Sequence, residues 1–140
     1  MAGLIDGKAL AKEVRAEVKA RAEAFRATHN RAPGLHVVLV GDDPASQVYV
    51  RNKERAAEKA GIEGRVHRLP AETSEADVLA LVCELKGDDH IDGILVQLPL
   101  PEHLHDQTIV DAIDPAKDVA GLHPFTSGLL VVGRKGLRPC

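Results

Sequence analysis

The sequence predicts an α/β fold in which helices cover both faces of an open parallel sheet, giving three layers. Three short segments with the composition of strands recur along the chain: apolar runs at residues 35–40 and 91–97, and an alternating, half-exposed segment at residues 65–69. Segments with helical spacing of their apolar residues separate them. A β-α-β-α-β succession of this kind is typical of a parallel sheet with crossover helices. At 140 residues the chain is long enough to form one domain with its own core.

The first predicted element is an amphipathic helix over residues 6–28. Its apolar residues recur at helical spacing, as one face of a helix requires, and they are Leu10, Val14, Val18, Ala22 and Phe25. Asp6 is suited to the N-cap, because its carboxylate can accept hydrogen bonds from the first helical amides. Residues 31–34 then predict a turn before the first strand.

The segment from Gly41 to Gly61 predicts a turn and then about four turns of helix. Pro44 suits the first turn, where a missing N–H costs little, and Gly61 suits the position just after the last turn. On a helical wheel the inward arc consists of Ser46, Tyr49, Val50, Ala56, Ala57 and Ala60. Lys53 falls in the middle of this arc. An inward lysine is costly to desolvate unless it has a partner or a chemical role.

The second half of the chain predicts further helices and two irregular segments. Ser74 is suited to cap a helix that continues to about Lys86, and another helix is expected around residues 108–113. The two prolines of residues 98–101 predict extended chain that leaves the sheet. Residues 114–121 predict a polar loop, and one more apolar run follows at residues 129–132.

Composition excludes several classes of function. A net charge of −3 and a pI near 6.1 argue against nucleic-acid and membrane partners. No apolar run is long enough to span a bilayer, and the N-terminus lacks the apolar region of a secretory signal. The two cysteines and seven histidines show no metal-binding spacing, so we expect no metal. We expect a cytoplasmic protein.

A polar site is predicted at the carboxyl ends of the strands, where open parallel sheets bind ligands. Lys53 and Tyr49 belong to the helix that follows the first strand, and Gln97 ends the third. The loop at residues 115–121 is expected to return to the same edge. Each feature also has a structural interpretation: a lysine that extends to solvent, a core or rim tyrosine, a satisfied amide and a solvated turn.

Three segments of the sequence resemble the signature segments of one enzyme family. They are VGDDPASQVYVRNKERAAEKAG, DGILVQLPLPEHL and DPAKDVAGLHP. These resemble bifunctional methylenetetrahydrofolate dehydrogenase/methenyltetrahydrofolate cyclohydrolase, and the likeness extends over residues 1–140. The resemblance implies the family's catalytic domain, an amino-acid-dehydrogenase-like N-terminal domain with a reduced folate as substrate. It also implies NADP as cofactor and a homodimer for the full-length enzyme.

The resemblance implies a role for individual residues. Lys53 matches the catalytic lysine, which assists proton transfers and water attack at the one-carbon bridge of folate. Tyr49 matches the tyrosine that stacks on the aminobenzoyl portion, and Gln97 matches the glutamine that hydrogen-bonds the lysine. The substrate-binding positions implied in this way are Ser46, Tyr49, Val50, Arg51, Asn52, Lys53, Val96, Gln97, Leu98, Pro99, Asp118 and Ala120.

The implied reactions belong to one-carbon metabolism. They are the NADP-linked oxidation of 5,10-methylenetetrahydrofolate and the hydrolysis of 5,10-methenyltetrahydrofolate to 10-formyltetrahydrofolate. Family members continue after the R-P-C segment with a Rossmann domain that binds NADP. We expect that domain to be absent here, assign no residue of this chain to NADP, and do not expect hydride transfer by this chain alone.

One residue departs from the family pattern. The family loop reads K-D-V-D-G, whereas this chain has Ala120 in place of the second aspartate, which normally holds the pterin ring. Losing a hydrogen bond to a buried polar group costs about 1–3 kcal/mol. Two alternatives therefore stay open beside a folate enzyme: a non-catalytic module of this family, used for assembly or otherwise degenerate, and an α/β ligand-binding domain unrelated to folate.

Overall fold

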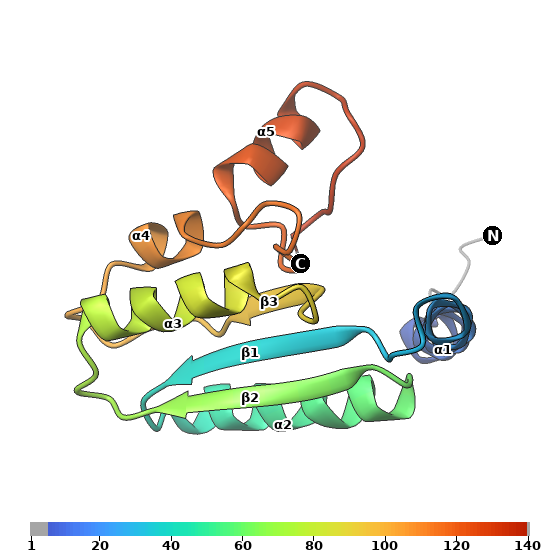
Figure 1. Ribbon diagram of the computed structural model, residues 1–140, viewed down its shortest axis with the longest axis horizontal. Helices are drawn as coiled ribbons and strands as arrows, with labels where there is room; N and C mark the ends of the chain where they lie inside the picture. Colours follow the sequence, from blue (N-terminus) through green and yellow to red (C-terminus); the bar gives the residue numbers. More distant parts are fainter. Residues whose placement is uncertain (1–5, 140) are drawn as a thin grey trace.

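The computed structural model describes residues 6–139 and confirms the α/β prediction (Figure 1). Three parallel strands form one sheet in the order β2-β1-β3. The strands are β1 (Gly34–Val40), β2 (Glu63–Leu69) and β3 (Gly93–Val96). The helices are α1 (Gly7–His29), α2 (Pro44–Lys59), α3 (Glu75–Gly87), α4 (Asp106–Asp111) and α5 (Pro124–Val131). The last helix contains most of the apolar run at residues 129–132, for which the sequence predicted no element type.

The central strand β1 pairs with both neighbours. Its register with β2 runs from Gly34 opposite Glu63 to Val40 opposite Leu69, and its register with β3 begins at Leu35 opposite Gly93. Because all three strands are parallel, their carboxyl ends lie at one edge of the sheet. The end of β1 is therefore next to the end of β3, which brings the helix after β1 close to the residues that follow β3.

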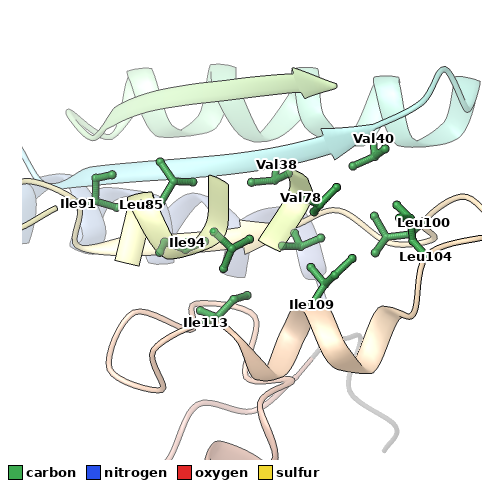
Figure 2. Close-up of a cluster of buried hydrophobic side chains, with 12 residues drawn as sticks. Val38, Val40, Val78, Leu85, Ile91, Ile94, Leu100, Leu104, Ile109 and Ile113 are labelled. Atoms are coloured by element: carbon green, nitrogen blue, oxygen red, sulfur yellow. The ribbon is translucent and has the colours of Figure 1, made fainter. Parts of the chain in front are cut away.

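The sheet is covered on both faces, as a parallel sheet requires. On one face, Val50 of α2 packs against Val37 and Leu39 of β1. On the other face, α3 and α4 pack against the alternate residues of the strands (Figures 1 and 2). The buried residues of this larger cluster are Val38, Val40, Val78, Val82, Leu85, Ile91, Ile94, Val96, Leu100, Leu104, Ile109 and Ile113.

Local hydrogen bonds cap the termini of the helices as the sequence predicts. The Asp6 carboxylate accepts from the Lys8 and Ala9 amides at 3.0 and 3.1 Å, and Ser74 caps α3. After α2, Gly61 has φ 75°, and the amide of Ile62 donates to the carbonyl of Ala57 at 2.9 Å. This is a Schellman arrangement, in which glycine avoids the strain that a side chain would meet at positive φ.

The apolar face of α1 is largely uncovered. Leu10 is 57% exposed and Val14 49% exposed, whereas Ala22 is buried. The helix lies beyond the amino ends of the strands and covers neither face of the sheet (Figure 1), although Arg26 near its end lines a groove together with residues of α2. Helical spacing correctly predicts the helix, but it does not predict which other element covers the apolar face.

An ion pair closes the amino edge of the sheet. Arg31 donates from Nη1 and Nη2 to the two carboxylate oxygens of Asp92, at 2.6 and 2.9 Å. Asp92 also accepts from the Gly34 amide at 2.8 Å. These contacts join the turn after α1 to the start of β3. The hydrogen bonds from Arg31 hold the pKa of the Asp92 carboxyl below its usual value.

Two histidines meet across β1 and β2. The Nδ1 atom of His36 and the Nε2 atom of His67 lie 3.0 Å apart, so one ring supplies the proton and the other the lone pair. Partial burial lowers the pKa of both imidazoles. The proximity of His67 and Arg65 lowers the pKa of His36 further, although Asp88 and Glu63 oppose this effect. The hydrogen bond and the lowered pKa values therefore both favour a state in which at least one of the two imidazole rings is neutral.

We expect this pair to make the protein sensitive to mild acid. Because both histidine pKa values are lowered by folding, the unfolded chain binds more protons as the pH falls through about 6.5, and the free energy of unfolding decreases. Urea denaturation at about pH 7.5 and about pH 5.5, a window in which carboxylates stay ionised, measures the effect. A double variant with His36→Gln and His67→Gln is expected to lose less stability over this window; an equal loss would contradict the prediction.

Candidate functional site

The start of α2 is fixed at the carboxyl edge of the sheet. The chain leaves β1 through Gly41, whose φ of 84° favours glycine. Asp43 caps the helix, because its carboxylate accepts from the Ser46 amide at 2.7 Å. This bond lowers the pKa of Asp43, with a smaller effect from the nearby Ser46 hydroxyl. Pro44 occupies the first turn, as the sequence predicts.

A hydrogen bond joins the middle of α2 to the end of β3. Lys53 donates from Nζ to Oε1 of Gln97 at 2.8 Å, and Gln97 donates from Nε2 to the Leu98 carbonyl at 2.7 Å. The Gln97 backbone amide donates to the Val38 carbonyl at 2.9 Å, which fixes the residue beside the central strand. The inward lysine that the sequence predicts therefore has a polar partner, and that partner is the predicted glutamine.

A cavity of about 360 Å³ lies at this hydrogen bond. Four segments of the chain form its walls: α2, β3 with the two residues that follow it, the loop after α4 and the C-terminal segment. The lining residues are Lys53, Leu95, Val96, Gln97, Leu98, Val119, Ala120, Leu122, Arg138 and Pro139. Five of them are residues that the sequence assigns to the site: Lys53, Val96, Gln97, Leu98 and Ala120. An amine held by an amide in a largely apolar cavity can exchange a proton with a bound ligand.

The loop after α4 is organised by a buried carboxylate. Asp118 is 2% exposed, and its Oδ1 atom accepts from the amides of Ala120 at 3.1 Å and Gly121 at 3.0 Å. Its Oδ2 atom accepts from the His123 amide at 2.9 Å. Both oxygens are therefore engaged by backbone amides of the loop that lines the cavity.

The remaining predicted residues of α2 point in different directions. Val50 is fully buried against β1, whereas Tyr49 is 60% exposed and lies one turn before Lys53. Tyr49 was expected on the inward arc, so the buried part of that arc is narrower than predicted. Ser46 is buried, and within residues 6–139 its hydroxyl makes no hydrogen bond of standard geometry.

Three other predicted residues do not line the cavity. Arg51 borders a separate groove of about 800 Å³ that also includes Arg26 of α1. Asn52 and Pro99 lie on the exposed surface. Each helical residue is rotated by about 100° from the previous one, so five consecutive residues cannot all face one cavity.

The sequence did not indicate the contribution of the C-terminal segment. Arg138 and Pro139 reach the cavity because the chain packs against Gly121, which has φ 71°. A side chain at Gly121 would place its Cβ atom 3.1 Å from the Leu137 carbonyl oxygen, so glycine is needed there for space as well as for conformation. The same packing brings Leu122 to the cavity.

In residues 6–139, no three His, Cys, Asp or Glu side chains are grouped so that they could hold a metal ion. No helix in the same part of the chain has the length and apolar character that crossing a membrane requires.

Comparison with known proteins identifies similar sequences along the whole chain. A family model described as tetrahydrofolate dehydrogenase/cyclohydrolase, catalytic domain, matches residues 5–120. The "Bifunctional protein FolD" of Sorangium cellulosum is 56% identical over 140 residues, and that of Magnetococcus marinus is 54% identical over 140 residues. The matches cover 99% and 100% of this chain but 49% of each relative. The chain thus spans about half the length of these relatives.

Solved structures of similar proteins have the same fold. The bifunctional FolD methylenetetrahydrofolate dehydrogenase/cyclohydrolase from Campylobacter jejuni is 42% identical, with a TM-score of 0.92 over 96% of this chain and 48% of its own. The methylenetetrahydrofolate dehydrogenase-cyclohydrolase from Trypanosoma brucei, solved with NADP and an inhibitor, is 32% identical. Its TM-score is 0.91, over 99% of this chain and 48% of its own.

The adjacent residues Tyr49 and Val50 allow a test of which face of α2 supports the fold. We expect Val50→Ala to lower the free energy of unfolding by about 2 kcal/mol, because it removes buried methyl groups and leaves a cavity. We expect Tyr49→Ala to change it by less than about 0.5 kcal/mol, as is usual for exposed positions. Urea denaturation measures both values, and a larger loss in Tyr49→Ala would contradict the packing described above.

Proposed function

Because the chain belongs to the tetrahydrofolate dehydrogenase/cyclohydrolase family, we propose that its 360 Å³ cavity binds a reduced folate and that Lys53 performs proton transfer at the one-carbon bridge. The observation that supports this most directly is the 2.8 Å hydrogen bond between Lys53 Nζ and Gln97 Oε1 at the cavity. It joins two of the segments that resemble the family, and Ala120 of the third lines the same cavity. One domain, residues 1–140, carries these groups.

The cyclohydrolase step requires a base and an oriented water molecule. Water adds to the bridge carbon of 5,10-methenyltetrahydrofolate, which carries positive charge, and loses a proton to the Lys53 amine in its neutral form. The added hydroxyl then loses its proton to solvent and becomes the formyl carbonyl as the bond from that carbon to N5 breaks, N5 takes up the proton from Lys53, and 10-formyltetrahydrofolate results. Gln97 orients the amine by accepting one of its hydrogens, and general acid–base groups placed in this way contribute about 10²–10⁴-fold to rate.

The dehydrogenase activity is proposed only for a whole enzyme of the relatives' length. NADP would accept the hydride from 5,10-methylenetetrahydrofolate, but this sequence contains no glycine-rich phosphate-binding motif to hold its phosphates. We therefore derive no step through NADP. In the whole enzyme, which we propose to be a cytoplasmic homodimer without nucleic-acid or membrane partners, this chain contributes substrate binding and proton transfer.

Specific side chains beside Lys53 are proposed to hold the folate. Tyr49 is exposed one turn from Lys53, where its ring is accessible to the aminobenzoyl portion of the substrate. Val96, Gln97 and Leu98 supply the wall on the β3 side. Ser46, Val50, Arg51, Asn52 and Pro99 do not line the cavity, so we propose that any effect of these residues on binding acts through the position of α2 and of the chain after β3.

A non-catalytic, folate-binding module is the second candidate function. Ala120 supports it, because this cavity residue has only a methyl group where the family pattern has a carboxylate. A cavity that keeps its lysine but loses an acceptor for the pterin ring could still bind folate weakly. An α/β domain for an unrelated metabolite is the third candidate, and failure to bind any reduced folate would favour it.

Replacement of the lysine separates the first two candidates. We expect Lys53→Met to lower cyclohydrolase turnover at least about 100-fold, since it removes the proton-accepting amine. The decrease in absorbance of 5,10-methenyltetrahydrofolate at high protein concentration measures turnover. Lys59→Met is the control, because Lys59 is an exposed residue of the same helix. Turnover that persists in Lys53→Met would refute the catalytic proposal, and folate binding without turnover in the unmodified chain would support the module.

Restoring the carboxylate tests the proposed place of the pterin ring. We expect Ala120→Asp to increase the affinity for a reduced folate by about 10-fold, the effect of one hydrogen bond worth about 1.4 kcal/mol. Isothermal titration calorimetry with 5-formyltetrahydrofolate measures the change, and Ala116→Asp in the same loop controls for added charge. Equal affinities of Ala120→Asp and the unmodified chain would argue against a pterin ring at this wall of the cavity.

A further inference from the structure

We propose that Asp118 is a positioning residue for the folate cavity and does not contact the substrate. Its buried carboxylate holds the backbone of residues 119–123, so that Val119 and Ala120 form the wall of the cavity that Lys53 and Gln97 also line. The inference rests on the proposed function. It gives Asp118 a different part in binding from the direct contact that the sequence predicts.

The contacts of the carboxylate support this role. Three backbone amides, those of Ala120, Gly121 and His123, donate to its two oxygens at 2.9–3.1 Å. The Asp118 side chain is 2% exposed, so its oxygens need hydrogen-bond donors within the protein, and the loop amides supply them. Asp118 is not among the residues that line the cavity, whereas the two residues that follow it are. The side chain therefore acts through the backbone that it holds.

The backbone on the other side of Asp118 is already anchored. Asp118 forms a parallel β-bridge with Ile94, and the Ile94 amide donates to the Lys117 carbonyl at 2.8 Å. The Lys117 ammonium donates to two carbonyls at the end of α3, those of Lys86 and Asp88. The loop thus begins at a fixed point beside β3, which also carries Gln97 at its end. From that point, the carboxylate determines how the chain turns toward the cavity.

The same carboxylate reaches the start of α5. The His123 amide donates to Asp118, and the Nδ1 atom of His123 accepts from the Phe125 amide at 3.0 Å, which caps that helix. Gly121, which Asp118 also holds, contacts the C-terminal segment that supplies Arg138 and Pro139. Asp118 therefore fixes one wall directly and supports a second through Gly121.

The variant Asp118→Asn tests this role with little change in size. The amide side chain keeps one acceptor oxygen, so it can hold either the Ala120 and Gly121 amides or the His123 amide, but not all three. We expect 5-formyltetrahydrofolate to bind about 10-fold more weakly by calorimetry, in conditions where the variant is fully folded by circular dichroism. The NMR amide resonances of Ala120, Gly121 and His123 are expected to shift in the same sample without ligand.

A matched control lies four residues earlier. The Asp114 carboxylate also accepts from a backbone amide, that of Ala116 at 2.8 Å, but Asp114 does not line or hold the cavity wall. Asp114→Asn should leave the affinity within about two-fold of the unmodified chain. Equal affinities for Asp118→Asn and the unmodified chain, or unchanged amide resonances of the loop, would overturn the proposal.

Absence of folate binding and failure of the variant to fold can both be told apart from failure of the proposed role of Asp118. If the unmodified chain does not bind 5-formyltetrahydrofolate, the proposed function fails, and the resonance shifts in Asp118→Asn still decide whether the carboxylate holds the loop. If Asp118→Asn does not fold, hydrogen exchange in the unmodified chain decides. The amides of Ala120, Gly121 and His123 should then exchange slowly, and exchange as fast as in exposed loops would overturn the proposal.

Discussion

The hydrogen bond between Lys53 and Gln97 is the interaction on which the candidate site depends. An ammonium or amine that faces inward from a helix loses hydration, and this cost must be offset by a partner. The amide oxygen of Gln97 supplies that partner at 2.8 Å. The amide is itself held, since its nitrogen donates to the Leu98 carbonyl and its backbone to Val38. The lysine is thus fixed at a cavity by a chain of bonds that ends in the sheet.

The strand order makes this hydrogen bond possible. With β1 between β2 and β3, the helix that follows β1 begins beside the end of β3, although 44 residues separate Lys53 from Gln97. The central position of β1 is consistent with its apolar run at residues 37–40, because both faces of that part of the strand are covered. The outer strand β2, by contrast, has exposed and half-buried residues and contributes His67 and Arg68 to the surface of the sheet.

Sequence reasoning predicted the features that depend on local contacts or on topology. Asp6 and Ser74 cap the starts of their helices, and Gly61 follows the last turn of α2. The hydrogen bonds at these positions join residues that are close in sequence, so a short stretch of sequence is enough to predict them. Lys53 and Gln97 could be paired because parallel strands end at one edge. The exposure of Tyr49 and the uncovered face of α1 could not be predicted, since helical spacing does not say which other element packs there. Arg138 and Pro139 reach the cavity through a contact with Gly121 that no periodicity encodes.

At Ala120 the backbone determines the shape of the cavity wall, whereas the side chain determines which polar groups that wall offers. The loop is held through the backbone amide of residue 120, which donates to Asp118, and the side chain takes no part in that bond. A carboxylate at this position can therefore be lost or restored without rebuilding the loop. The same independence explains how the chain can keep the pair of Lys53 and Gln97 and the fold of its relatives while the group proposed to recognise the pterin ring is absent. Any loss of substrate recognition at this wall would then come from the missing acceptor itself, and not from a collapsed cavity.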